Sequence, residues 1–102
     1  MRDPLTVAFE KYLHIAKELL LSCIKIKQVD STIQMLEKGE DTTESLVADK
    51  DFRDIRVGIS RATYYIDKVK QMEEVEVSLI KEARAELDPI CDYMKEKMSR
   101  KE

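Results

Sequence analysis

Apolar residues recur at steps of three and four positions in the first third of the chain, a pattern that predicts one long amphipathic helix over residues 5–38. The stripe consists of Leu5, Phe9, Tyr12, Ala16, Leu19, Cys23 and Ile26. Leu13, Leu20 and Ile24 widen this apolar face. We therefore expect the helix to contact more than one neighbour.

The ends of this first helix also have sequence signals. Asp3 can cap the N-terminus, Pro4 suits the first turn, and Gly39 can adopt the left-handed conformation that ends a helix. Asp30 falls where the stripe requires an apolar residue, so the helix is expected to be irregular or broken there. We favour continuity, because neither Gly nor Pro lies nearby.

A second helix is predicted from a cap at Asp41 or Thr43 to about Met72. Its first turns, residues 44–51, are mostly polar. Beyond them, apolar residues follow a strict three–four repeat, the spacing that is typical of a coiled-coil seam. This seam consists of Phe52, Ile55, Ile59, Ala62, Ile66 and Val69.

A third helix is expected after an acidic interruption at residues 71–78, where we place a turn. Its stripe consists of Ile80, Ala83, Leu87, Ile90 and Met94. Pro89 lies inside this stripe, where it removes one backbone hydrogen bond and clashes with the preceding turn. The helix is therefore predicted to kink there, or to restart with Asp88 as its cap.

These elements predict an all-α fold, an antiparallel up-down-up bundle of three long helices that forms a single domain over residues 1–102. A break near Asp30 or Pro89 would add a fourth short helix. Up-down-up topology brings Cys23 and Cys91 to a similar height on parallel helices. We expect both thiols to be buried near each other as small core residues, and a disulfide or redox switch is the alternative.

Composition supports this fold class and narrows the possible functions. The chain has 102 residues, of which 43% are hydrophobic and 38% are charged, with only two Gly and two Pro. Its 18 basic and 21 acidic side chains give a net charge of −3, and no basic region suggests nucleic acid. No segment resembles a signal peptide or a membrane span, so we expect a cytoplasmic protein with no membrane contact.

His14 is the only histidine, and it shares a helical face with Glu10 and Glu18. The stripe places this face opposite the core, so we expect a solvated histidine. With Lys17, His14 resembles the His-x-x-Lys part of the histidine phosphotransfer motif, a family of helical bundles. Glu18 departs from that motif, which has Gly after the lysine, and its charge would repel an incoming phosphoryl group.

Paired carboxylates are the other candidate chemistry. Helical nucleotide pyrophosphatases bind magnesium with Glu-x-x-Glu followed by Glu-x-x-Asp, and this chain contains Glu37-x-x-Glu40 and Glu73-x-x-Glu76. Both pairs lie at predicted helix ends, and no Glu-x-x-Asp follows either pair. Two cysteines are also too few for a zinc site. We therefore predict no enzyme activity, no metal and no cofactor.

The second helix supplies the best candidate contact residues. Gly58 and Ala62 permit a close helix approach beside the seam, and one of the adjacent Tyr64 and Tyr65 must point away from it. The interface candidates are Phe52, Ile55, Gly58, Ile59, Ala62, Tyr64, Tyr65, Ile66 and Val69.

Three arginines of the same helix, Arg53, Arg56 and Arg61, could bind an anion or an acidic partner. Asp51, Asp54 and Asp67 interleave with them, so pairing within the helix is the favoured interpretation.

Together these features predict a non-enzymatic protein–protein interaction or assembly module. Self-association through the coiled-coil-like seam is expected, with a dimer favoured, and an unidentified protein partner is also open. The alternative is a small catalytic or phosphotransfer domain that uses His14 or the clustered carboxylates.

Overall fold

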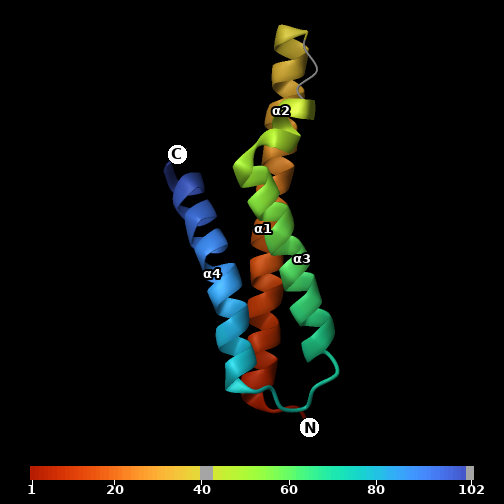
Figure 1. The fold of residues 1–102 in the computed structure, drawn as a ribbon, viewed down its shortest axis with the longest axis vertical. Helices are drawn as coiled ribbons and strands as arrows, with labels where there is room; N and C mark the ends of the chain where they lie inside the picture. The colour runs from red at the N-terminus through yellow and green to blue at the C-terminus, as the bar shows by residue number, and fades with distance from the viewer. Residues whose placement is uncertain (40–42, 101–102) are drawn as a thin grey trace.

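The computed structural model describes residues 1–39 and 43–100, with the side chains of residues 43–45 and 100 left out. Its elements are α1 (Pro4–Lys38), α2 (Thr43–Ala48), α3 (Lys50–Val69) and α4 (Val77–Arg100). The chain runs up α1, down α3 and up α4, while α2 lies beside the far end of α1 (Figure 1). The predicted all-α, up-down-up bundle with three long helices is confirmed.

The length of α1 determines the elongated shape of the bundle. A helix of 35 residues spans about 52 Å at 1.5 Å per residue, and the whole chain measures 56 × 25 × 19 Å. Both α3 and α4 are shorter, so the C-terminal part of α1 projects beyond the end of α4 (Figure 1). Among the described residues of α1, none after Cys23 is buried.

The predicted ends and continuity of α1 are confirmed. Gly39 follows the helix with a φ of 68°, and its N–H donates to the Met35 carbonyl. The helix passes Asp30 without interruption. Asp3 is the N-cap residue, but its side chain makes no capping hydrogen bond; its backbone N–H instead donates to the Glu73 carbonyl at 2.9 Å.

The predicted face of α1 was only partly right. The buried residues are Thr6, Phe9, Leu13, Ala16, Leu20 and Cys23. Leu5 and Ile26, which the predicted stripe included, are exposed, and Tyr12 and Leu19 are half-buried. The true core face is rotated slightly because α3 and α4 approach α1 from two sides, which a single stripe does not describe.

The prediction of one second helix was wrong, because the chain breaks at Asp49 into α2 and α3. The Asp49 carboxylate accepts a hydrogen bond from the Phe52 N–H at 3.1 Å and an ion-pair contact from Lys27 Nζ at 3.1 Å. It therefore caps α3 and ties its first turn to α1. The fourth short helix arises here, not at Asp30 or Pro89. The suggested cap at Asp41 lies outside the described residues.

The third helix was predicted to kink or restart at Pro89, and α4 passes this residue as one continuous helix. Both Pro89 and Ala85, whose carbonyl loses its intrahelical donor, are exposed. Water can therefore satisfy the free carbonyl. Asp88 does not act as a cap. It accepts hydrogen bonds from the Tyr12 hydroxyl and from Arg84 Nε, the latter at 2.9 Å.

The connection between α3 and α4, residues 70–76, is held against the start of α1. The buried Thr6 hydroxyl accepts a hydrogen bond from the Val75 N–H at 2.8 Å. The Arg2 guanidinium donates to the carbonyl of Val69 at 3.0 Å and also to that of Met72. This clamp accounts for a defined connection where the sequence contains neither Gly nor Pro.

Gly58 sets the distance between α3 and α1. A Cβ atom added to this buried residue would lie 2.6 Å from Leu20 Cδ1 and 3.5 Å from Ile90 Cδ1. The small Gly58–Ala62 pair thus serves a close approach inside the chain. Ala62 belongs to the core cluster around Leu13, Tyr65 and Leu87, whereas the neighbours of Gly58, Leu20 and Ile90, belong to or pack against a second cluster with Ile55 and Met94.

We expect Gly58→Val to lower the free energy of unfolding by about 2 kcal/mol, because added carbon atoms overpack the contact with Leu20. Urea unfolding followed by circular dichroism measures the change. Ser60→Val, at an exposed position of the same helix, is the matched control and should change stability little. Equal effects of the two variants would show that the close approach does not matter.

The Asp49 cap has a pH signature. Burial acts to raise the pKa of this carboxyl, but hydrogen bonds from the Phe52 N–H and Lys27 outweigh it, and the pKa falls below its ordinary value of 3.8. A depressed pKa stabilises the fold above the ordinary value, and that stabilisation is lost as the pH falls through the folded-state pKa.

Asp49→Ala should therefore cost about 1 kcal/mol at pH 7 and progressively less below about pH 4. Asp49→Asn keeps the capping oxygen and should retain most of the stability at pH 7. Unfolding curves at pH 7 and pH 3 make the comparison. A cost for Asp49→Ala that does not change with pH would contradict the assignment.

Candidate functional site

The predicted seam of α3 lies inside the chain. Phe52, Ile55, Ala62, Ile66 and Val69 are buried and Ile59 is half-buried. All of them except Phe52 belong to, or pack against, the two core clusters that also contain side chains of α1 and α4. With Gly58 they form the monomer core. In this structure they are therefore not available to a second chain.

The two adjacent tyrosines diverge as expected. Tyr65 is 2% exposed, and its hydroxyl donates to Glu86 Oε2 of α4 at 2.7 Å. Burial, followed by this carboxylate, raises the pKa of Tyr65. Tyr64 is 51% exposed, and Lys68 Nζ lies 5.5 Å from its ring centroid. Of the two, only Tyr64 remains accessible to a partner.

The arginines of α3 are exposed along one edge of the helix. Together with Val57 and Ser60, Arg53, Arg56 and Arg61 line a shallow surface depression. Arg61 Nε lies 4.0 Å from a Glu86 oxygen of α4, and the Arg56 guanidinium stands 5.8 Å from the Phe52 ring centroid.

The expected pairing of these arginines within their helix is not found. Asp54 binds Lys50 at 2.7 Å, and Asp51 binds Lys97 of α4. Within the described part of the chain, Arg53 and Arg56 make no ion pair. Lysines thus engage Asp51 and Asp54, the two acidic residues nearest Arg53 and Arg56, so this edge of α3 presents positive charge to solvent.

A stripe of exposed apolar residues lies on α1, for which the sequence predicted no site. Its positions alternate by four and three residues through three heptads on one face of the helix. This α1 seam consists of Ile15, Leu19, Ser22, Ile26, Val29, Ile33 and Leu36. Ile15, Val29 and Leu36 are 65%, 56% and 77% exposed. Apolar heptads of this length are a coiled-coil signal.

The α1 seam is separate from the core face of the same helix. At about 100° per residue, it lies roughly a third of a turn around α1 from the line of Phe9, Ala16 and Leu20. Leu19 and Ile26 lie on the border between the two faces, and Leu19 is half-buried. The signal that could have found this seam was the same three–four spacing, hidden because apolar residues almost surround α1.

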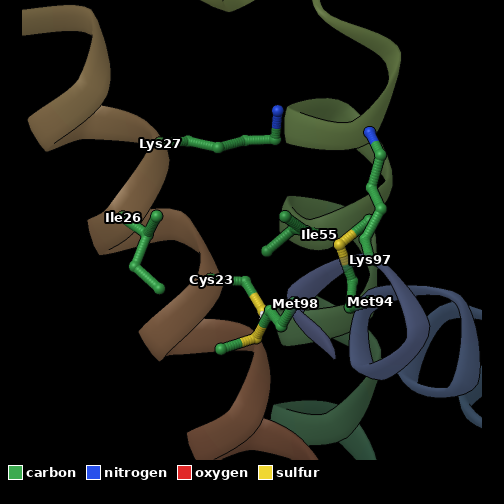
Figure 2. A pocket seen from close by; sticks show the side chains of 7 residues that line it. All are labelled: Cys23, Ile26, Lys27, Ile55, Met94, Lys97 and Met98. Carbon is green, nitrogen blue, oxygen red and sulfur yellow. Dashed lines mark hydrogen bonds between the residues drawn. The ribbon is translucent and has the colours of Figure 1, made fainter. Parts of the chain in front are cut away.

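A hollow of about 180 Å³ opens where α4 ends against α1 and α3. Its walls are the apolar side chains of Cys23, Ile26, Ile55, Met94 and Met98. Figure 2 shows the ammonium groups of Lys27 and Lys97 together at one side of it. Each is paired with a carboxylate at the start of α3, Lys27 with the N-cap residue Asp49 and Lys97 with Asp51, so the charges at the mouth are balanced.

The predicted burial of Cys23 and Cys91 is confirmed. Both are free thiols, they are 4% and 6% exposed, and they belong to the same core cluster. Cys23 Sγ lies 3.3 Å from Met98 Sδ. Burial raises the pKa of both thiols, which keeps them protonated and unreactive near neutral pH.

His14 is exposed, as expected. Glu10 is paired with Arg2, and Glu18 is exposed. Glu37, Glu73 and Glu76 are also exposed, and Glu40 lies outside the described residues. No group of three or more His, Cys, Asp or Glu side chains that could hold a metal ion occurs in residues 1–39 and 43–100.

None of the described helices has the length and apolar character needed to cross a membrane. Comparisons of the chain with protein-family models, with curated proteins and with solved structures gave no match. The function must therefore be argued from the surfaces of this fold alone.

We expect both native thiols to react slowly with a water-soluble thiol reagent at pH 8, because reaction requires the core to open. Ser60→Cys adds an exposed thiol on α3, and this one should react at least about 100-fold faster. Absorbance of the released reagent measures both rates. Native thiols that react as fast as the thiol introduced on α3 would contradict their burial.

Proposed function

We propose that this chain is a non-enzymatic protein–protein interaction module that self-associates along the α1 seam. The observation that carries the proposal is the exposure of Ile15, Val29, Ile33 and Leu36 in heptad register on one helix. Single exposed apolar residues are common on protein surfaces. A continuous stripe of them on a soluble chain marks an interaction site.

The distal part of the α1 seam, beyond Leu19, belongs to neither core cluster of the monomer. The two core clusters close without Val29, Ile33 or Leu36. These side chains gain burial only when another helix lies along them, and each fully buried aliphatic side chain contributes about 1.5–3 kcal/mol. The proposed association therefore uses a coiled-coil-like seam, as the sequence predicted, but on α1 and not on α3.

The phosphotransfer alternative has no observation in its favour. The exposed His14 lies in no hollow that we find among the described residues, and Glu18 lies exposed on the same face. The arginine edge of α3 remains a candidate contact for an acidic partner.

The proposal predicts a solution mass near twice the chain mass of 11.9 kDa, measured by size-exclusion chromatography with light scattering. Ile33→Glu should weaken association at least about tenfold, because a charge would be buried at the seam. Helix content should not change, since Ile33 is 46% exposed in the monomer.

Val57→Glu provides the matched control for this variant. Val57 is a comparably exposed apolar residue, 55% exposed, on the outer side of α3, so its substitution should leave the mass unchanged. A wild-type chain that remains at 11.9 kDa at about 100 μM would overturn self-association. Loss of the dimer in Val57→Glu alone would move the interface to α3.

A further inference from the structure

The order of residues along the α1 seam also indicates how a second helix would align with it. Each heptad of the seam has two positions. Leu19, Ile26 and Ile33 occupy the first, and Ile15, Ser22, Val29 and Leu36 occupy the second. We propose that the occupant is α1 of a second copy of this chain, aligned parallel and in register. This inference rests on the proposed self-association and specifies its geometry.

Parallel, in-register alignment places each seam residue beside its own counterpart. The β-branched Ile26 and Ile33 then occupy the heptad position where such residues favour two-stranded parallel coiled coils when Leu holds the other seam position, as Leu36 does in the last heptad. Ser22 would meet Ser22 of the second copy, a small pair flanked by larger apolar layers. The contact is isologous, so it closes at two chains.

Charges beside the seam distinguish the two possible orientations. Lys25 is exposed on one edge of the α1 seam, and Asp30 lies on the other edge five residues later. In a parallel pair, a residue on one edge of the seam lies beside the residue five positions later on the other edge of the second helix. Lys25 of each copy therefore lies beside Asp30 of the other, which gives two ion pairs related by the twofold axis.

An antiparallel pair brings like edges together instead. With the seams overlapped from Leu19 to Leu36, Lys25 would lie near Thr32, an uncharged residue, and Asp30 near Cys23, which is buried. Neither contact pairs opposite charges. Charge complementarity thus favours the parallel orientation, in agreement with the role of edge charges in setting helix orientation.

The shape of the bundle leaves room for this partner. Beyond Cys23 the described part of α1 has no buried residue, and it projects past the end of α4 (Figure 1). Ile26 belongs both to the α1 seam and to the wall of the hollow. A second α1 would therefore lie along the open edge of that hollow.

Site-directed cross-linking tests the orientation. Ser22→Cys and Ile33→Cys chains are mixed in equal amounts and oxidised mildly, and the products are counted by mass spectrometry. Parallel alignment predicts the two homodimers, joined 22 to 22 and 33 to 33. Antiparallel alignment pairs residue 22 with residue 33, so a dominant mixed disulfide would overturn the inference. Wild type, with its buried thiols, controls for unrelated cross-links.

A charge swap provides an independent measurement. Lys25→Glu should weaken dimerisation about tenfold at low salt, because two ion pairs become two repulsions. Combining it with Asp30→Lys should restore the wild-type affinity. An unchanged affinity for Lys25→Glu would overturn the parallel pairing.

These outcomes separate the orientation from the function. A wild-type mass of two chains without either homodimer cross-link would refute the parallel seam and leave self-association standing. A monomeric wild type would refute the proposed function itself, and the orientation with it.

Discussion

Helix α1 is longer than the rest of the chain can cover, and this mismatch underlies the other features of the structure. Its 35 residues span about 52 Å, whereas α3 has 20 residues and α4 has 24. Both shorter helices pack against α1 near its N-terminal half, from two sides of its core face. The α1 seam, roughly a third of a turn away, stays exposed for most of its length and carries aliphatic residues in heptad spacing.

Polar contacts then decide how the covered part is assembled. The hydroxyls of Tyr12 and Tyr65 each donate to a carboxylate of α4, Asp88 and Glu86 respectively. These bonds join α4 to α1 and to α3, so the partly buried carboxylates and phenols satisfy one another. The Asp49 cap with Lys27 performs the same task at the other end, where α3 begins beside α1.

Helices α1 and α3 differ in the surface that they leave exposed after folding. Helix α3 is mainly apolar on one side, and this side is buried in the core of the monomer. Its outer side is charged, with Arg53 and Arg56 exposed. α1 is apolar on two sides, so one remains after folding. An apolar stripe left in water has a free-energy cost that association would remove, and this is the physical reason for proposing α1 as the contact element.

Much of this architecture was determined by the sequence alone. Residue spacing identified the three long helices, Gly39 marked the end of the first helix, and the topology brought Cys23 and Cys91 into one cluster. Local signals are reliable here because helix periodicity and caps depend on residues within a few positions of one another.

Tertiary structure decided what local spacing could not. The Asp49 cap is joined to Lys27, which is 22 residues away, a contact that local spacing cannot predict. Pro89 is tolerated because its face of α4 meets water. Tertiary packing also decided which of two apolar stripes, the seam of α3 or the α1 seam, stays exposed. Periodicity shows that a stripe can be buried, but only the packing of α1, α3 and α4 determines which stripe the chain itself covers.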